Sequence, residues 1–439
     1  MFTVKAGTEL TPELVEEAIA YNDKEKPRLD NLANYYLGEH TIKYRTKAEA
    51  QSNNKVIVNH AKYITDVNVG YLLGNPVTYK TSKEFNIEPL LDEYNKQVIA
   101  DLDREIAKDV SIFGKQYELV YNVDNSPRSK DIDVRNCVLV YDDTIEHKVV
   151  LGIIYKRAEK RGEFEDILVY DDNFVYNYTQ KGRIALNTID PHYFGEVPIV
   201  KYQNNSDEQG DFEQIISLQD AYNTLQSDRV NDKEQLVDAL LLIYGMQITP
   251  EQKELMKASR MMANLPADSK VEYLTKQLNE LDADTLRRVL EQDIHKISMT
   301  PNMSDENFVG NSSGVAIRYK LLAFEQNILG KERSFEAGLK SRFRKYNNYL
   351  ANLKKMPFIE THEVDVIFKR NLPRNDFETS QMVNNLSGLV SKSTLLSQLS
   401  FVDDVKEEIE TAEEEDVETG VKLDRNFGTV NPTEFPVKI

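Results

Sequence analysis

Residues 306–326 read ENFVGNSSGVAIRYKLLAFEQ, a polar stretch with glycine and serine that runs into an amphipathic helical pattern. Gly310, Ser312 and Gly314 form Gly-x-Ser-x-Gly, the motif that places a nucleophilic serine on a sharp turn between a strand and a helix. That arrangement needs a buried strand before the serine, and only two apolar residues separate the motif from the polar segment PNMSDEN. The motif alone therefore does not predict a serine hydrolase.

The partners that a catalytic serine requires are also missing. A single histidine, His362, follows the motif, and no Asp lies between it and Gly314. Ser312 or Ser313 is better interpreted as a helix N-cap, whose hydroxyl accepts from free N–H groups of the first turn and contributes about 1 kcal/mol.

The helix after this cap is predicted to run from about Gly314 to Leu353. At 1.5 Å per residue it would be about 60 Å long. Gly330 and Gly338 lie inside it and are predicted bends, because glycine disfavours the helix interior by about 1 kcal/mol relative to alanine.

Outward from this helix, hydrophobic periodicity and turn residues predict the other elements. The fold class is α+β. The predicted elements are helices at 11–36, 59–73, 87–112, 211–244 and 282–298, a strand at 77–82, an antiparallel meander of short strands at 115–202, a small α/β insert at 246–275, a strand pair around 363–371, and amphipathic helices from about 376 to 415.

Composition and charge exclude several classes of protein. The one cysteine, Cys137, excludes an internal disulfide and favours a reducing, intracellular setting. No apolar run reaches the roughly 20 residues of a membrane-spanning helix, and the start of the chain lacks the pattern of a signal peptide. A net charge of −19 argues against a protein that grips nucleic acid over its whole surface. We expect a soluble protein with no membrane partner.

The charge is nevertheless uneven along the chain. Residues 318–355 hold ten Lys or Arg against three Glu, and residues 403–418 hold ten acids against one Lys. Such segregation is typical of a solvated helix face and a solvated tail, but the basic segment could equally form one side of a contact between subunits.

Carboxylate pairs are the remaining candidates for catalysis. Asp142-Asp143 and Asp171-Asp172 each follow a Tyr at the end of a predicted strand. They could hold Mg²⁺ for nuclease chemistry, or they could be hairpin-turn residues, because Asp readily turns the chain. No other spacing predicts a metal site or a bound cofactor, so we expect neither.

Four segments, taken in order, resemble the portal proteins of tailed phages, the head-to-tail connectors, in their siphophage-type branch. They are NYYLGEHTI (34–42), NHAKYITDVNVGYLLGNPVTY (59–79), GEVPIVKYQNNSDEQGDFEQIISLQDAYNTLQSDRVNDKEQLVDALLLIYG (195–245) and FVGNSSGVAIRYKLLAFEQ (308–326). Each segment alone is weak evidence for the resemblance, but four segments in this order and with this spacing are specific. Together they span nearly the whole chain.

The resemblance implies a portal fold with a defined set of parts. They are an N-terminal helical extension (1–29), a wing of helices and an antiparallel β meander (30–210), an outgoing stem helix (211–245), a small α/β clip (246–281), a returning stem helix (282–298), a tunnel loop (299–313), a long kinked wing helix (314–355), wing strands (356–375), and a helical crown with an acidic tail (376–439).

The resemblance also implies which residues meet which partners. The tunnel loop would face DNA through Asn302, Met303, Ser304, Asp305, Glu306, Asn307, Asn311 and Ser312. Channel cations could come from Arg287, Arg288 and Lys296, although Arg287 could equally pair with Asp284 or Glu291. The clip would dock the motor through Gln247, Glu251, Lys253, Lys257, Arg260, Lys270 and Glu272.

The function implied is structural and non-enzymatic. A ring of twelve subunits at one capsid vertex would conduct double-stranded DNA, meeting the large terminase subunit, then head-completion proteins, beside capsid and scaffold proteins. Such a ring would be assembled in the host cytoplasm. Two alternatives stay open: a metal-dependent nuclease or other nucleic-acid-processing enzyme using Asp131, Asp133, Asp142 and Asp143, and a monomeric adaptor with a helical arm.

Overall fold

A computed structural model describes most of the chain. The described residues are 1–48, 51–81, 85–157, 164–181, 183–237, 240–244, 249–250, 270–274, 280–303, 314–370, 376–396, 399, 402, 405, 408–409 and 411–412. They belong to two compact units, one formed by Met1–Gly310 with Tyr319–Arg370 and the other by Asn311–Arg318 with Asn371–Ile439.

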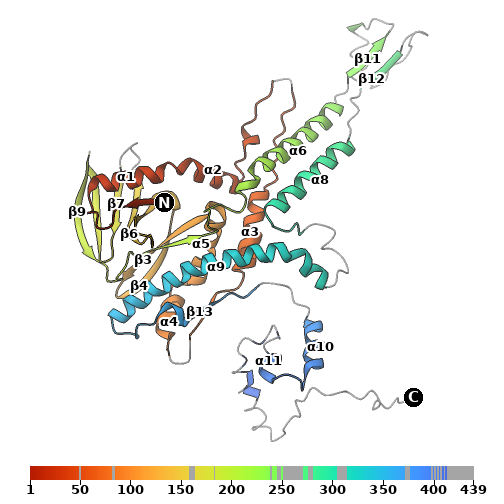
Figure 1. Ribbon diagram of the computed structural model, residues 1–439. Coiled ribbons are helices and arrows are strands. Elements are labelled where there is room, and N and C mark those ends of the chain that lie inside the picture. The colour runs from red at the N-terminus through yellow and green to blue at the C-terminus, as the bar shows by residue number, and fades with distance from the viewer. Residues whose placement is uncertain are drawn as a thin grey trace, which may run out of the picture. The chain divides into compact units, whose positions relative to one another are not determined.

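The larger unit is built on a six-stranded sheet in the order β1-β5-β6-β7-β8-β9 (Figure 1). Neighbouring strands are antiparallel except β1, which runs parallel to β5. The strands are β1 (Phe2–Val4), β5 (Cys137–Asp142), β6 (Val149–Arg157), β7 (Phe164–Tyr170), β8 (Phe174–Lys181) and β9 (Arg183–Pro191). The predicted antiparallel meander is confirmed for β5–β9, but the strands at the two ends of the predicted range, 115–132 and 199–203, form a separate sheet. The strand β1 was not predicted because three residues are too few to show a strand period.

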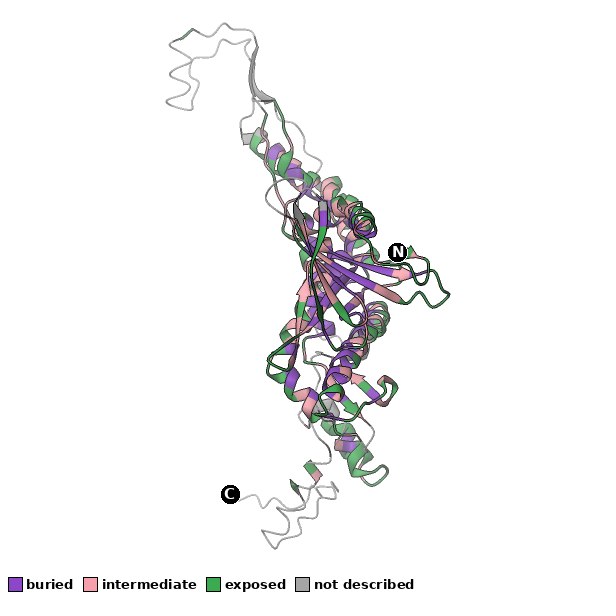
Figure 2. Ribbon diagram, turned by 90° about the vertical axis from the view of Figure 1, so that its left-hand side faces the viewer, coloured by how far each residue is buried: buried purple, intermediate pink, exposed green. Residues whose placement is uncertain are grey.

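Helix α1 (Pro12–Asp23) covers one face of this sheet. Thr11 caps the helix by accepting from the backbone N–H of Leu14 at 3.3 Å, and a proline opens it. Its apolar stripe at Leu14, Val15, Ala18 and Ile19 packs into a core with the buried residues of β5 and β6. Figure 2 shows the buried residues concentrated along the strands. The first residues of the chain are therefore part of the sheet's core.

The remaining helices and two smaller sheets complete the body, and many of their apolar residues pack into a second core against Cys137, Leu139 and Tyr170 of the large sheet. These elements are α2 (Lys26–Tyr36), η1 (Thr41–Tyr44), α3 (His60–Leu72), β2 (Thr78–Thr81), α4 (Glu88–Asn95), α5 (Ile99–Phe113), β3 (Lys115–Val123), β4 (Ser126–Ile132), η2 (Val134–Asn136), β10 (Ile199–Gln203), η4 (Thr361–Glu363) and β13 (Val364–Ile367). One sheet has the order β10-β3-β4, and β13 pairs antiparallel with β2. The single helix predicted at 87–112 is two helices, because Val98 takes a left-handed φ of 52° that interrupts the helical turn.

Two antiparallel helices project side by side from this body, and a β hairpin lies beyond their far ends (Figure 1). They are α6 (Ile216–Val237), which follows η3 (Glu213–Ile215), and α8 (Glu280–Ile297); the hairpin consists of β11 (Leu240–Tyr244) and β12 (Lys270–Leu274). The prediction of one helix over 211–244 is wrong at its far end. The run LLLIY at 240–244 is a strand, because a short apolar run fits either structure and pairing with β12 decides it.

Helix α9 (Gly314–Asn352) is the long helix that the sequence predicted. Gly338 does not merely permit a bend, because a Cβ at this position would lie 2.3 Å from a ring carbon of Tyr202. The glycine lets α9 pack directly against that ring. At Gly330 a Cβ would meet nothing within 4 Å, so packing does not require glycine there.

The smaller unit includes α10 (Asp376–Leu386) and α11 (Lys392–Leu396), which contact each other. Val383 of α10 and Leu395 of α11 are buried. These helices occupy the residues predicted as a helical crown.

Candidate functional site at the foot of the helical pair

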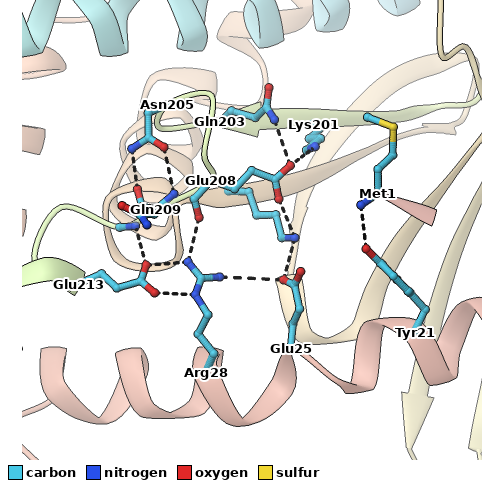
Figure 3. Close-up of polar contacts among 12 residues, drawn as sticks. Met1, Tyr21, Glu25, Arg28, Lys201, Gln203, Asn205, Glu208, Gln209 and Glu213 are labelled. Atoms are coloured by element: carbon cyan, nitrogen blue, oxygen red, sulfur yellow. Dashed lines mark hydrogen bonds and ion pairs between the residues drawn. The ribbon is translucent and has the colours of Figure 1, made fainter. Parts of the chain in front are cut away.

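The segment that leads into α6 is fixed by an ion-pair network (Figure 3). Arg28 of α2 donates to both carboxylate oxygens of Glu213, each at 2.6 Å, and to the backbone carbonyl of Glu208 at 2.9 Å. The Glu208 carboxylate also lies 2.8 Å from Lys115 and 2.5 Å from Lys201. Burial would raise the pKa of Glu208, but the two lysines outweigh it and lower the pKa to about 2.

The same segment also approaches the end of α5 very closely. Gly114, with φ 84°, ends that helix, and a Cβ there would lie 2.0 Å from the Glu208 carbonyl oxygen. Only glycine accommodates both the left-handed φ and this approach. The start of α6 is thus held in a defined place on the body.

Helix α8, which returns to the body, ends beside α3. The residues that follow it form hydrogen bonds with α3 and with α8 itself. The Tyr63 hydroxyl of α3 donates to the Pro301 carbonyl and accepts from the Met303 backbone N–H, both at 2.9 Å. Asn302 donates from its side-chain amide to the Glu291 carboxylate of α8 at 2.9 Å. We call residues 299–303 the loop root, because they begin the predicted tunnel loop.

A buried set of polar side chains joins the loop root to α3, α5 and α9 and to the segment that precedes α6. Asn68 of α3 donates to the Thr300 hydroxyl at 2.9 Å and accepts from the Lys331 ammonium of α9 at 2.8 Å. Lys331 also forms an ion pair with Asp211, which in turn accepts from the Ser111 hydroxyl of α5. We call these five residues the polar hub. Burial lowers the pKa of Lys331, although Asp211 opposes that effect.

Aromatic rings fill the space between α3, α6 and α8 at the same foot. His60 makes edge contacts with Tyr222 at 4.9 Å and with His295 at 5.8 Å between ring centroids. Burial, and secondarily His295, lower the pKa of His60 to about 4. His295 lies 2.9 Å from the Thr300 carbonyl oxygen through its Nδ1. These histidines pack as neutral rings at neutral pH.

The predicted channel cations differ in their surroundings. Arg287 pairs with Asp284 at 3.0 Å and with Glu291 at 2.7 Å, which confirms the alternative that it forms ion pairs within α8. Arg288 also pairs with Asp284, at 2.8 Å, but its side chain is 68% exposed. Lys296 is exposed near the end of α8. Arg288 and Lys296 therefore present charge at the surface, whereas Arg287 is largely compensated.

Most of the other predicted site residues lie outside the described residues. These are Ser304, Asp305, Glu306, Asn307, Asn311 and Ser312 of the tunnel loop, and Gln247, Glu251, Lys253, Lys257 and Arg260 of the clip. Lys270 and Glu272 lie in β12, opposite Tyr244 and Leu242 of β11. The suggested cap at Ser312 or Ser313 also lies outside the described residues.

The basic stretch of α9 pairs largely within the chain. Arg342 is buried between Asp103 and Glu118, and Arg344 and Lys345 both reach Glu196. Because Arg342 and Lys345 are buried within the chain, the suggestion that this stretch forms one side of a subunit contact is wrong for these two residues. For the exposed Arg344 it stays a prediction. Sequence reasoning missed this role, although Arg342 falls at helical spacing on the apolar stripe of α9.

The carboxylates suggested for nuclease chemistry have local structural roles. Asp142 accepts from the Thr144 hydroxyl at 2.7 Å and from the Lys148 backbone N–H at 3.0 Å, which closes the turn between β5 and β6. Asp143 accepts from the Ala6 N–H at 3.0 Å. Asp133 caps η2 and pairs with Arg135 at 2.7 Å, while Asp131 lies opposite Glu118 in the β3–β4 ladder.

Among the residues that the structure describes, no three His, Cys, Asp or Glu side chains gather in a way that could hold a metal ion. Nor does any helix in this part of the chain have the length and apolarity to cross a membrane.

Comparison with known proteins accounts for this architecture. The family described as "Phage portal protein, SPP1 Gp6-like" matches residues 16–421, which include α6, the β hairpin, α8 and α9. This chain belongs to that family of phage portal proteins. Portal proteins are structural proteins of the phage particle, which confirms the prediction that the chain is not an enzyme.

Two portal proteins are similar to this chain along most of their length. The portal protein of Bacillus phage SPP1 is 25% identical over 421 residues, covering 87% of this chain and 82% of that protein. The portal protein of Clostridium phage phiCD119 is 21% identical over 389 residues, covering 81% and 83%.

Solved structures with a partly similar fold come from gene transfer agent particles. A chain from the virion of the native particle has a TM-score of 0.45 at 13% identity, covering 90% of this chain and 93% of that chain. A chain from the neck of the native particle, computed with C12 symmetry, has a TM-score of 0.45 at 14% identity, covering 77% and 88%.

Proposed function

We propose that this portal protein forms a closed ring of twelve subunits around a channel at one vertex of a phage capsid. Double-stranded DNA would be packaged through that channel and later ejected through it. The observation that carries the proposal is the family match over 16–421, because it spans the sheet body, the helical pair with its hairpin, and the long helix together.

The parts of the chain have matching roles in this proposal. The body formed by the sheets and α9 is the wing, α6 and α8 are the stem helices, and the β11–β12 hairpin belongs to the clip. Residues 299–313 are the tunnel loop, and residues from 376 onward are the crown. The antiparallel helical pair that ends in a hairpin away from the core supports the assignment of stem and clip.

Weak contact with DNA is what a conducting channel needs. Dense Lys or Arg contacts to phosphate, or readout of base edges, would hold the duplex rather than let it pass. The loop root, Met-Thr-Pro-Asn-Met, carries no charged side chain, and residues 304–313 add two acids and no base. Asn302, Met303 and the loop residues that follow, with Arg288 and Lys296, are the proposed DNA-facing residues.

The proposed partners follow from the same arrangement. The clip would dock the large terminase subunit during packaging and head-completion proteins afterwards, and the wing and crown would meet capsid and scaffold proteins. Assembly would take place in the host cytoplasm, and the finished ring would reside in the virion.

The mass and shape of the purified protein test the ring directly. Light scattering on a sizing column, with negative-stain images, should give rings with a central hole and a mass near twelve times 50.5 kDa. Coexpression with the phage's scaffold and capsid proteins covers the case of a ring that needs partners to assemble. A compact monomer under both conditions would overturn the proposal and favour the monomeric adaptor.

A further inference from the structure

The polar hub is where the loop root meets the body. Thr300 lies three residues beyond the end of α8, Asn68 is in α3, Lys331 is in α9, Ser111 is in α5, and Asp211 precedes α6. Asn68, Ser111, Thr300 and Lys331 are buried, and the Asp211 side chain is 4% exposed. One small cluster thus links the loop root to α3, α5 and α9 and to the segment that precedes α6.

Asn68 has no spare hydrogen-bonding group in this cluster. Its amide nitrogen donates to the Ile64 carbonyl at 2.8 Å and to the Thr300 hydroxyl at 2.9 Å, and its oxygen accepts from Lys331 at 2.8 Å. An amide has two donor hydrogens and one acceptor oxygen, and turning it over would place the NH₂ group against the lysine ammonium. The orientation of Asn68 is therefore determined, and with it the place of Thr300.

If the only role of the residue at position 331 were to fill space, an apolar side chain would serve better than lysine. It stands on the apolar stripe of α9 with Phe324, Ile328 and Phe335. Burying a charge is costly, and apolar replacements of buried ion pairs are often neutral or stabilising. A buried charge does specify geometry, however, because its partners must remain within hydrogen-bonding distance.

Close packing does not join the loop root to α9 on one side of the hub. An open groove of about 370 Å³ lies there, and its lining residues include Ile297, Met299, Gly330 and Lys331. Where packing is absent, the hydrogen bonds from Thr300 through Asn68 to Lys331 connect the two elements.

We propose that Asn68 and Lys331 are positioning residues that fix where the tunnel loop begins relative to α9. The structure shows the contacts themselves, and only their consequence for DNA rests on the proposed function. If either contact is removed, the loop root should move more freely while the body and the ring stay intact.

A spin label on the loop root measures this positioning without DNA. Met303 contacts Tyr63 through its backbone and is 53% exposed, so Met303→Cys provides a label site. The native Cys137 is fully buried and should not react. The label would be read in the full-length protein carrying Asn68→Ala, Lys331→Met, or neither. Arg333→Met, an exposed cation of the same helix, is the matched control.

The expected result is a shift from slow to fast label motion in Asn68→Ala and Lys331→Met, with no shift in Arg333→Met. Label motion that matches the control in both variants would overturn the proposal. A second variant, Lys331→Met combined with Asp211→Asn, removes both buried charges while still breaking the link to Asn68. Fast motion in that double variant supports positioning by Lys331. Slow motion would show instead that Lys331 only neutralises Asp211, and would overturn its assignment.

DNA retention separates this inference from the proposed function. Capsids assembled with each variant would be filled and then challenged with nuclease. Loss of packaged DNA together with fast label motion supports both statements. Fast label motion with normal DNA retention would keep the positioning role and count against a loop that acts on DNA.

Discussion

The guanidinium group of Arg342 in α9 donates to the carboxylate of Glu118 in β3 at 2.7 Å, and both side chains are fully buried. Asp103 of α5 completes the cluster from the other side of the same guanidinium. The long helix is thereby joined to the sheet body by a charge that has no access to water.

Loss of this guanidinium should destabilise the protein severely. Arg342→Met would leave two buried carboxylates without their cation, and breaking a buried pair in this way typically costs about 3–5 kcal/mol. Chemical denaturation of the purified protein would measure the loss. Arg344→Met is the matched control, because its pair with Glu196 is 44% exposed on the arginine side and should cost about 1 kcal/mol or less. Equal losses in the two variants would contradict this account.

Replacing each of two glycines of α9 by alanine should change the stability of the protein in opposite directions. Gly338→Ala would push a methyl group into the Tyr202 ring and should destabilise by about 1–3 kcal/mol. Gly330→Ala meets open space and should stabilise by up to about 1 kcal/mol through helix propensity. Thermal unfolding of the two variants would show the contrast, and a gain in stability for Gly338→Ala would refute the packing argument.

Stability should fall in mildly acidic solution because of His60. Its folded pKa of about 4 is below the value near 6.5 of an unfolded histidine. Between these values the unfolded chain binds the extra proton, so the stabilising contribution is present above about pH 6.5 and is lost as pH falls toward 4. The partly buried His295, whose pKa is also lowered by desolvation, acts in the same direction.

The test is the unfolding temperature between pH 7 and pH 4. His60→Phe keeps the ring contact with Tyr222 but does not titrate, so its stability should decline less steeply with acid. His362→Phe removes a histidine that is 75% exposed and should leave the profile unchanged. A His60→Phe profile parallel to that of the unmodified protein would rule out this histidine as a source of the dependence.

The tunnel loop should be dispensable for assembly. Deleting residues 303–309 should leave rings of normal mass while impairing DNA packaging or retention, because the core clusters consist of residues outside that stretch. The deletion also removes the Met303 N–H that donates to the Tyr63 hydroxyl, an exposed contact at the edge of the body. Negative-stain images and nuclease protection of packaged DNA would measure the two effects. Normal packaging and retention by the deletion variant would contradict the tunnel-loop assignment.

The elements of the fold could largely be predicted from sequence. The alternation from Lys115 to Tyr202 and the helical periods of α1, α3, α8 and α9 carry their own signals. The elements that were predicted wrongly or missed depend on pairing with strands far away in the sequence. The run at 240–244 became a strand only because β12 lies beside it, and β1 is visible only as a neighbour of β5.

The site was less predictable, because its key contacts join distant residues. Tyr63 meets Pro301, and Asn68 meets Lys331 across 263 positions, without a motif to link them. A charged residue at helical spacing within an apolar stripe was the available signal for Lys331 and Arg342. From composition alone these cations would be expected at the surface, whereas in the fold Lys331 and Arg342 are buried.

The Arg342 cluster also sets the order in which this protein can be completed on the ribosome. Arg342 lies 224 positions after Glu118, a delay of roughly 11–45 s at about 5–20 residues per second. During that interval the nascent sheet body carries two carboxylates whose cation has not yet been made, so they must remain hydrated. The two core clusters of the body consist of residues that precede α9 in the sequence, so they can pack before that helix emerges. Only the contacts that α9 makes through Arg342 must wait for it.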